Sequence, residues 1–593
     1  MHKKIVASFI LFTFCSLSAF AFEQKLVTRY SLDAEEVPAE VLANQSGITW
    51  ENRERGPVPG LREYDRVDAK VVWLGSDQGA ARFDPYATHP WDRWQYFWGK
   101  RWLADNEVQA MWVDKSADYE SVWIRTKTGA SRIEWEPMEF EEKSAHFYDV
   151  IENRHLRHDF ISDAGLPAPG DITSSTTHTN DNDGLWSAMY LVAQVYRYAV
   201  TKDPDAKMKA RRTLDALIRL EEINPLPGFY ARSFVHISEA SPDSRHWGKE
   251  NGKWKWVNEK YTPEQVFKGG EDWIQNEKGD WILVEYASHA EYVPHSGEWH
   301  ATSDGKWLWK GDTSSDETVG HYYAYALYYD LVANADEKKL ISDKVRLLTD
   351  DLISDDYYLI DVDGIPTRWG NWNKAYFDSE EGDYERALRA MELLSLLKVT
   401  YHVTGDQKYQ DLYFDFVKKG WAEWTNEYRR WDSDFIEINF SDDELYYLSV
   451  QPLMMYEQDP ELRAIYLDGM QYTWSQIASD KNALWNYINA ACGIVEMNPR
   501  IQDESKRTLA RSPWEAIEWR VENSHRIDLP AMPDRNRHGR AELVSVIPPD
   551  ERRVHKHNTS PYTPDGGGNG TREEAPTYWL LPYWMGRYYE WID

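Results

Sequence analysis

Cysteine is nearly absent from this chain, which has two, Cys15 and Cys492. The first lies in the amino-terminal stretch MHKKIVASFILFTFCSLSAFA, where two lysines precede an apolar run and a small-residue Ala-Phe-Ala site. This pattern predicts a cleavable export signal over residues 1–21, and hence a periplasmic or secreted protein. One thiol would remain after cleavage. An internal disulfide is then excluded, and a packed core must hold the exported chain together.

Long hydrophobic runs and an excess of basic residues are also missing. No later apolar run is long enough to cross a membrane. Lys and Arg number 67 against 99 Asp and Glu, and the formal net charge of −32 argues against a nucleic-acid partner. Compact zinc-ligand spacing, a P-loop and a Gly-x-Ser-x-Gly elbow are all absent. We therefore expect no cofactor, with carboxylate-bound Ca²⁺ left open because such sites leave little sequence trace.

Aromatic residues, by contrast, are abundant, with 30 Trp and 37 Tyr. Aromatic faces stack on the apolar faces of sugar rings, while charged and amide groups bind the hydroxyls. Many of these rings belong to the core of any large domain. In an exported acidic chain, the excess favours a carbohydrate ligand.

A tryptophan-containing pattern occurs twice near the amino terminus. VVWLGSDQGAARFD (71–84) is followed by SVWIRTKTGASRIE (121–134), with Trp73 matching Trp123 and Gly79 matching Gly129. Short strands closed by a glycine turn fit this spacing. The pattern resembles the repeat of bacterial regulator-type β-propellers. Two copies cannot close a propeller, so we interpret residues 22–145 as a small β-rich, propeller-like unit that leans on the next domain.

The remainder, residues 146–593, has a helical pattern. Successive helix pairs with short turns on one side and long loops on the other predict a mainly α fold, an (α/α) toroid or barrel. The loops 224–313 and 498–578 are too long for simple connections, and we expect them to form a cleft; the first carries eight Trp residues and suggests a β excursion. Helices are predicted at about 184–202, 205–222, 317–334, 337–354, 380–404, 406–425, 443–457, 460–479, 484–497, 513–523 and 577–591.

The stretch WKGDTSSDETVGHYYAYALYYDLV (309–332) is the most informative for chemistry. Its Ser314-x-x-Glu317 capping-box pattern fixes where a helix begins. Glu317, His321 and Tyr325 are four residues apart and therefore share one stripe, with Tyr322 beside them. A carboxylate, an imidazole and a phenol together suit proton transfer. The plainer alternative is that the acids only cap the helix and that His321 only pairs with Glu317.

A second helix is predicted to begin near Asp183, in THTNDNDGLWSAMYLVAQVYRYAV (177–200). His178, Asn182 and Asp183 then lie at the same end of their helix as Glu317 does of its own. If both are inner helices of one toroid, these groups face each other, although a cap and turn explain them equally well. Arg154 and His155 precede this helix by a loop and are candidates for the same region.

Two further segments suggest recognition of an anionic sugar. DVDGIPTRWGNWN (361–373) places Arg368 beside Trp369, and a guanidinium can bind a carboxylate with two hydrogen bonds. Residues 500–557 form a local basic island in an acidic chain, as an anionic ligand requires. An Arg stacked on Trp, or a surface patch without function, is the alternative in each case.

The motifs NDNDGLW, GDTSSDE, TRWG and LLPYWMGRY, together with the tryptophan repeat, resemble those of exported bacterial α/α-toroid proteins of polysaccharide-utilisation systems. This resemblance covers most of the chain and extends in function to the ulvan oligosaccharide dehydratases. It implies an enzyme acting on uronic-acid-containing oligosaccharides by β-elimination, as a dehydratase or lyase.

Three functions follow as alternatives. In an elimination, His321 and Tyr325 or Tyr322 would be base and acid, and Arg368 or Asn182 would neutralise the uronate. An inverting glycoside hydrolase would instead use two carboxylates such as Asp183 and Glu317. A non-catalytic glycan-binding protein is the third. The sequence makes no prediction of oligomeric state.

Overall fold

The structure, a computed structural model, describes most of the chain. It covers residues 22–51, 54–68, 70–239, 299–362, 364, 366–380, 382–430, 440–535, 541–554 and 556–593; residues 299, 368, 534 and 535 and four short strands between 247 and 283 are described by their backbone alone. The predicted export signal lies outside the described residues. None of the described helices combines the length and apolar character that a membrane-crossing segment needs.

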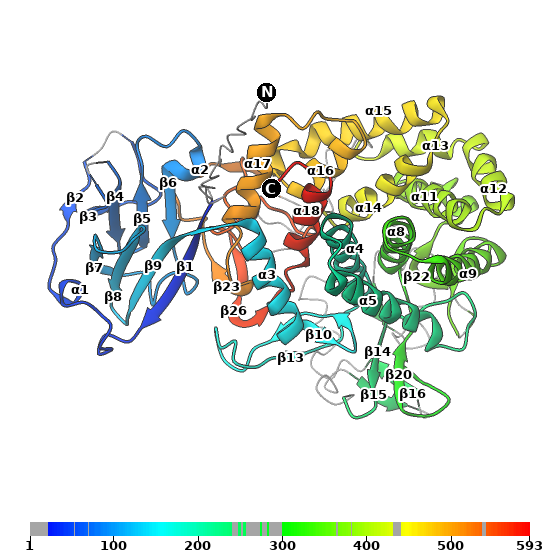
Figure 1. Cartoon of the computed structure of the whole chain (residues 1–593), viewed down its shortest axis with the longest axis horizontal. Coiled ribbons are helices and arrows are strands. Elements are labelled where there is room, and N and C mark those ends of the chain that lie inside the picture. The colour runs from blue at the N-terminus through cyan, green and yellow to red at the C-terminus, as the bar shows by residue number, and fades with distance from the viewer. Residues whose placement is uncertain are drawn as a thin grey trace, which may run out of the picture.

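The amino-terminal region forms two antiparallel sheets that pack on each other at one end of the molecule (Figure 1). The strand orders are β1-β9-β8-β7 and β2-β3-β4-β5-β6. Side chains from both sheets, among them Trp73, Phe97, Val122 and Trp135, form one buried cluster. The strands are β1 (Phe22–Tyr30), β2 (Ile48–Thr49), β3 (Arg62–Arg66), β4 (Val72–Ser76), β5 (Gly79–Phe83), β6 (Trp94–Phe97), β7 (Val108–Val113), β8 (Ser121–Thr126) and β9 (Ala130–Met138).

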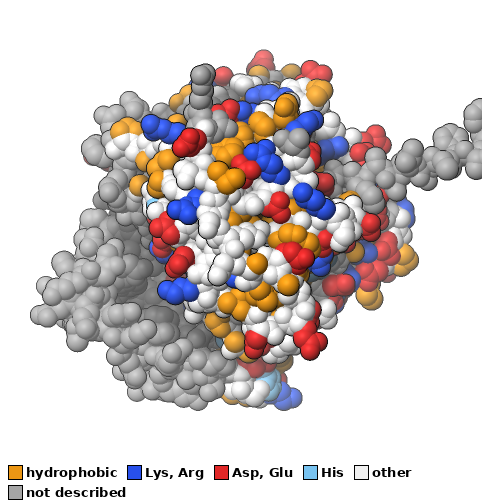
Figure 2. Space-filling view, turned by 90° about the vertical axis from the view of Figure 1, so that its left-hand side faces the viewer, with side chains coloured by type: hydrophobic (Ala, Val, Ile, Leu, Met, Phe, Trp, Pro, Cys, Tyr) orange, Lys and Arg blue, Asp and Glu red, His pale blue; other side chains and the backbone are white. Residues whose placement is uncertain are grey.

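The repeated tryptophan pattern forms two hairpins, as predicted. In β4–β5 Trp73 lies opposite Arg82, and in β8–β9 Trp123 lies opposite Arg132. Gly79 has a φ of +116°, a conformation that side chains disfavour, which explains the glycine of the first turn. The propeller comparison is not supported, because the two sheets share one core and no ring of blades occurs in the described residues. Figure 2 looks onto this end, where acidic, basic and apolar side chains are intermixed.

Twelve helices of the described carboxy-terminal region form a double ring. Six are buried nearly all round, as expected of helices enclosed by other helices. Each of these contacts the next, and α18 contacts α4, so the inner ring closes. The inner helices are α4 (Asp183–Thr201), α8 (Ser315–Leu331), α11 (Arg386–Thr404), α14 (Phe440–Tyr456), α16 (Ala483–Ala491) and α18 (Thr577–Tyr588); the outer helices are α3 (Phe140–Val150), α5 (Pro204–Glu222), α9 (Ala335–Ser354), α12 (Gln407–Lys418), α15 (Pro460–Ile477) and α17 (Pro499–Arg511). The predicted (α/α) toroid is confirmed.

The helix predictions miss α3, which lies across the predicted boundary at residues 145–146, and one predicted helix is wrong. Residues 513–523 were expected to be helical, but β23 (Ile517–Val521) lies there, and α17 precedes it within the expected long loop. The signal for α17 was present, because Asn498 accepts hydrogen bonds from Arg500 and Ile501 as the cap and Pro499 occupies the first helical position. The segment 406–425 is also divided, into α12 and the short α13 (Trp421–Trp424).

Strands from the two long loops add small sheets to one side of the ring (Figure 1). Among the described residues of 224–313, five strands form a β excursion, with strand order β14-β20-β19-β16-β15. Of its eight Trp side chains, those of Trp307 and Trp309 are described. The strands are β14 (Ser233–His236), β15 (Trp247–Glu250), β16 (Lys253–Trp256), β17 (Trp273–Gln275), β18 (Trp281–Leu283), β19 (Trp299–Ala301) and β20 (Trp307–Lys310). A second sheet joins β12 (Ala164–Gly165), β13 (Thr176–Thr177), β23 and β26 (Gly566–Glu573).

The β-sandwich and the ring are connected through Asp550, in the segment before β26. Its carboxylate accepts from Lys25 of β1 and forms a 2.9 Å ion pair with Arg511 of α17. Arg101 of the sandwich donates to the backbone oxygens of Asp550 (2.9 Å) and Arg552 (2.6 Å). The sandwich therefore fixes the backbone on both sides of residue 551.

Candidate active site at the rim of the helix ring

The amino-terminal ends of the inner helices gather on one rim. Five of the inner helices are each followed by an outer helix that returns along the ring, and the last inner helix, α18, lies beside α4 and α3. Helix amino termini carry unpaired N–H groups and a partial positive charge, which favour anionic groups. The rim is accordingly rich in carboxyls, including Asp183 of α4, Asp316 and Glu317 of α8, and Asp443 and Glu444 of α14.

The beginnings of α4 and α8 lie side by side, as the sequence predicted for two inner helices. The Cβ of any side chain placed at Gly184 would lie 3.1 Å from Glu317 Cγ and 3.6 Å from His321 Cε1. Glycine at this position thus permits the close approach of the two helix ends. Asp183 and Glu317, the predicted carboxylate pair, come from these two adjacent ends.

Glu317 is fully buried beside the half-buried Asp316. Its Oε2 lies 2.6 Å from Ser314 Oγ, which also lies 2.8 Å from Oδ2 of the half-buried Asp316. Ser314 caps α8, as predicted, by accepting from the Asp316 backbone N–H. Burial and the charge of Asp316 raise the pKa of Glu317 to about 8, although Arg232 acts in the opposite direction. This carboxyl is therefore mostly protonated at neutral pH.

Glu444 is a second buried carboxyl, at the start of α14. It is 1% exposed, and its Oε1 has no hydrogen-bond partner within the described part of the chain. Burial and then the charge of Asp316 raise its pKa to about 8, against the opposing charge of Lys556. The rim thus combines protonated carboxyls with Asp316, which solvent reaches.

Asp183, by contrast, is held in a buried ion pair. Its Oδ2 accepts from Arg157 (3.0 Å) and from the Asn180 N–H (3.0 Å), and its Oδ1 accepts from Ser162 (3.2 Å). Burial still raises its pKa above the ordinary value. These contacts give Asp183 a structural role in fixing the start of α4.

Arg154 and His155 lie in another buried cluster around Glu573. Arg154 binds this carboxylate with two hydrogen bonds, of 2.6 and 2.9 Å, and His155 Nε2 lies 3.2 Å from Glu573 Oε2. Burial alone would raise the pKa of Glu573, but these contacts lower it to about 2. The two predicted binding residues are therefore engaged by a carboxylate of the protein itself.

The predicted proton-transfer stripe does not reach the rim surface. His321 is fully buried, with Nδ1 2.6 Å from the Glu317 carbonyl oxygen and its ring stacked on Tyr230. Burial lowers its pKa to about 4, so the imidazole is neutral. Tyr325 donates to Glu221 of α5 (2.5 Å), and Tyr322 lies 2.7 Å from Thr349 of α9. Both phenol groups point to outer helices. Their geometry therefore does not place them against a substrate at the rim.

The other predicted binding residues are dispersed. His178 is exposed, and Asn182 is half-buried just before α4. Trp369 is half-buried on β22 (Pro366–Asn371), which pairs with β21 (Tyr358–Ile360). The Arg368 side chain lies outside the described residues, so its predicted contact with a sugar carboxylate stays a prediction.

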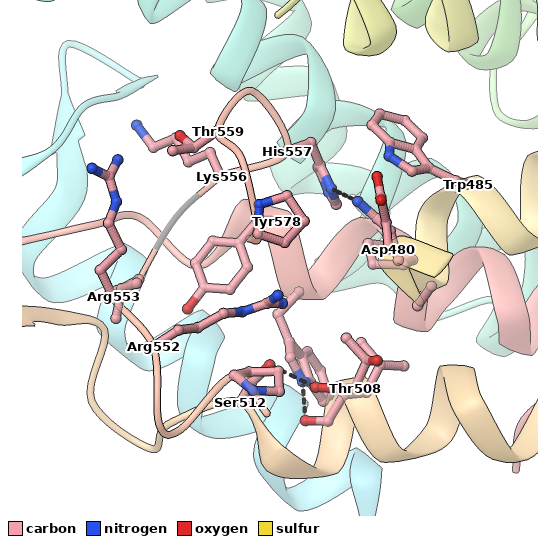
Figure 3. Close-up of a pocket in the computed structure, with 18 of the residues that line it drawn as sticks. Asp480, Trp485, Thr508, Ser512, Arg552, Arg553, Lys556, His557, Thr559 and Tyr578 are labelled. Atoms are coloured by element: carbon pink, nitrogen blue, oxygen red, sulfur yellow. Dashed lines mark hydrogen bonds between the residues drawn. The ribbon is translucent and has the colours of Figure 1, made fainter. Parts of the chain in front are cut away.

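A pocket opens along the same rim, between α16, α17, α18 and the segment 549–561 (Figure 3). Its empty volume is about 680 Å³, with the open solvent at its mouth included. Arg552, Arg553, Lys556 and His557 line it, so the basic island predicted at residues 500–557 contributes to a pocket wall. Asp480, Asn482, Trp485 and Tyr578 lie around them.

Glu444 was missed by the sequence analysis, although a signal for it exists. Ser441-Asp442-Asp443-Glu444 repeats the Ser-x-x-Glu pattern of Ser314 to Glu317, and both precede a pair of tyrosines. The pattern marks the start of the helix predicted at 443–457. Arg552 and His557 were noted within the basic island, but nothing in their spacing indicated that they meet Tyr578.

No metal centre is evident at this rim. The described residues contain no group of three or more His, Cys, Asp or Glu side chains arranged to hold a metal ion. The expectation that the protein needs no cofactor remains a prediction.

Comparison with known proteins gives structural neighbours alone. No known family and no curated protein matches the chain. A single-mutant thermostable endoglucanase from Alicyclobacillus acidocaldarius shows 12% identity and a TM-score of 0.38, over 89% of this chain and 99% of that chain. A metagenome-derived glycoside hydrolase family 9 endoglucanase shows 12% identity and a TM-score of 0.36, over 95% and 97%. Such values carry no assignment of activity. Neither is an ulvan oligosaccharide dehydratase, so that resemblance also stays a prediction.

Proposed function

We propose that this chain is a carbohydrate-active enzyme that hydrolyses glycosidic bonds at the rim of its helix ring. The observation that carries the proposal is that Glu444, a carboxyl kept protonated by burial, is influenced by the charge of the half-buried Asp316 at the same rim. A buried, protonated carboxyl can serve as a general acid, and a second carboxyl that solvent reaches can serve as a general base. The excess of Trp and Tyr and the expected export support a glycan as the substrate.

In this mechanism Glu444 is the general acid and Asp316 the general base. Glu444 donates its proton to the oxygen of the leaving sugar as the glycosidic bond breaks. Asp316 accepts a proton from the water that attacks the anomeric carbon from the opposite side, which inverts the configuration. Glu317 and Asp316 both contact the Ser314 hydroxyl, which fixes the position of the Asp316 carboxylate. This pair replaces Asp183 and Glu317, the pair suggested by the sequence.

A second candidate, β-elimination on a uronic acid, is favoured by a different group of residues. Tyr578 Oη and His557 Nε2 are buried in the pocket without a hydrogen-bond partner among the described residues, next to Arg552. Burial raises the pKa of the Tyr578 hydroxyl and lowers that of His557 to about 3, so both are neutral. A phenol, an imidazole and a guanidinium are the groups that proton removal beside a carboxylate requires. These residues offer the chemistry that the sequence analysis had assigned to His321, Tyr325 and Arg368.

The two candidates give products of different mass and absorbance. We would incubate the protein with neutral and uronate-containing oligosaccharides and follow products by mass spectrometry and by absorbance near 235 nm. Hydrolysis adds 18 Da in total to the products, whereas elimination produces an unsaturated uronate that absorbs. Hydrolysis that is lost in Glu444→Gln supports the proposal. Absorbance near 235 nm that depends on Tyr578 and persists in Glu444→Gln would instead indicate elimination and overturn the hydrolase proposal.

Turnover of neither kind, with saturable oligosaccharide binding, would indicate the third alternative, a non-catalytic glycan-binding protein. A matched control is Glu461→Gln, which changes an exposed glutamate in the first turn of the outer helix α15. Loss of activity in this control as well would show that the Glu444→Gln result reflects general instability.

A further inference from the structure

Arg552 is a buried cation without an ionic partner of its own. Its side chain is 6% exposed, and its Nε and Nη1 make no hydrogen bond within the described part of the chain. In Figure 3 its guanidinium extends across the middle of the pocket, past Tyr578. Burial lowers the pKa of Arg552 to about 10, which still leaves it charged at neutral pH. A buried, unpaired guanidinium is costly to the fold unless something else supplies the anion.

The carboxylates around Arg552 are already bound by other groups. Asp550 is taken by Lys25 and Arg511. Glu551 pairs with Arg526 at 2.8 Å. Asp480 accepts from Tyr562 Oη at 2.7 Å; its charge acts on Arg552, but burial raises its pKa to about 7 and so leaves it partly neutral. The protein therefore provides no carboxylate that is dedicated to Arg552.

The other residues of the pocket also suit an anionic ligand. Tyr578 Oη and His557 Nε2 are unpartnered, so each can donate a hydrogen bond to an acceptor. Lys556 adds a further positive charge, although its Nζ is held by Asp163 (2.7 Å) and Glu574 (3.1 Å). Phe440 and Trp485 give the wall an apolar part. An oxyanion carried on a ring with apolar faces would satisfy both the guanidinium and the wall.

We propose that this pocket is an anion subsite in which Arg552 binds the oxyanion of an acidic sugar, a carboxylate or a sulfate ester, with Tyr578 and His557 as further donors. The proposal rests on the proposed carbohydrate function and specifies its substrate class. The planar fork of Arg552 can present two parallel N–H groups to such an oxyanion, which gives orientation as well as affinity.

Binding of monosaccharides tests the subsite without any turnover. We would titrate the full chain with glucuronate, glucose 6-sulfate and glucose, and measure heat and tryptophan fluorescence, since Trp485 lines the pocket. At least one acidic sugar is expected to bind tenfold or more tightly than glucose, and the tighter of the two identifies the oxyanion. Arg552→Gln is expected to remove this preference, and Arg552→Lys to keep part of it.

The control variant is Arg520→Gln, which changes an exposed arginine paired with Glu522 outside the pocket and leaves the preference intact. Equal affinity of the wild type for acidic and neutral sugars would overturn the inference, as would an undiminished preference in a folded Arg552→Gln. If Arg552→Gln fails to fold, the wild-type comparison and Arg552→Lys decide.

Failure of the subsite is distinguishable from failure of the proposed hydrolysis. Glu444→Gln is expected to lose turnover while it retains the preference for acidic sugars. Hydrolysis of neutral oligosaccharides without any such preference would overturn the subsite and leave the hydrolase proposal in place.

Discussion

The carboxyl groups of Glu317 and Asp316 converge on one hydroxyl, that of Ser314, at 2.6 and 2.8 Å. A hydroxyl has a single hydrogen and can donate it to one of them only. Both contacts are satisfied if Glu317 is protonated and donates to Ser314, which in turn donates to Asp316. The pKa of Glu317, raised to about 8 by burial, agrees with this order of donors. The protonated member is thus fully buried, and its neighbour Asp316 is half-buried.

Replacement of either member of the proposed acid–base pair should abolish turnover. General acid or base catalysis contributes about 10²–10⁴-fold, so we expect Glu444→Gln and Asp316→Asn each to lower kcat by about that factor. Steady-state kinetics with an oligosaccharide substrate, together with circular dichroism to confirm the fold, measures this. A loss below threefold in a folded variant would remove that residue from the mechanism.

The stability of the protein should depend on Glu444 in a particular pH range. The pKa of this carboxyl is raised from 4.5 to about 8 by burial, against the influence of Lys556 and with that of Asp316. Between these values the native state binds more protons than the unfolded state, so the contribution of Glu444 to stability decreases as pH rises. The decrease in free energy of unfolding between pH 5 and pH 8 should be smaller in Glu444→Gln, as measured by urea denaturation. An identical slope in both proteins would contradict the protonated state.

Arg154 should matter for stability more than for substrate affinity. Arg154→Ala leaves Glu573, which is 0% exposed, without its two-hydrogen-bond partner. Breaking a buried ion pair from one side costs about 3–5 kcal/mol. The control, Arg520→Ala, removes an exposed pair and should cost about 0–1 kcal/mol. Equal destabilisation in thermal and urea unfolding would refute the distinction.

Replacement of Arg511 and of Arg552 by Gln should change the free energy of unfolding in different ways. Arg511 binds Asp550 and lies 3.3 Å from Glu551, and its replacement by Gln should destabilise the fold by about 3–5 kcal/mol. Arg552 has no such pair, so Arg552→Gln should leave the free energy of unfolding of the ligand-free protein unchanged or raise it. Urea denaturation of the wild type and of the two variants measures these changes in the free energy of unfolding. A large loss in Arg552→Gln would mean that the fold depends on this cation.

His321 is a test of the sequence-based mechanism. Its ring is fully buried against Tyr230, at 4.8 Å between centroids, so His321→Ala creates a cavity and should destabilise the protein by about 2–5 kcal/mol. We expect kcat of the folded fraction to change less than threefold below the unfolding temperature. Loss of turnover with unchanged stability would restore His321 to the chemistry.

The fold was predictable where one local pattern determines it. Helices α8 and α9 are capped by Ser314 and Asn334, whose side chains accept from the first backbone N–H groups. Residues of this type mark a helix start in the sequence. The two hairpins of the tryptophan repeat are also local. Their packing into a sandwich instead of propeller blades depends on side chains such as Trp135, far apart in sequence from their partners in the other sheet.

The site was less predictable, because its residues converge from distant segments. Glu317, His321 and Tyr325 do lie along one side of α8. Sequence spacing alone does not show whether that side faces a neighbouring helix or the rim. The two phenols turn to α5 and α9. Arg552 and Tyr578 are separated in sequence by the glycine-rich strand β26, and they come together only in the assembled ring.

Through Arg101, the β-sandwich supports the pocket at the rim of the helix ring. Arg101 anchors the carbonyl oxygens of Asp550 and Arg552, so the wall of the pocket is built partly from outside the helices. A fragment that starts after Met138 would keep every ring helix but lose this buttress. A substitution of Arg101, which does not itself line the pocket, would therefore loosen the backbone of the pocket wall.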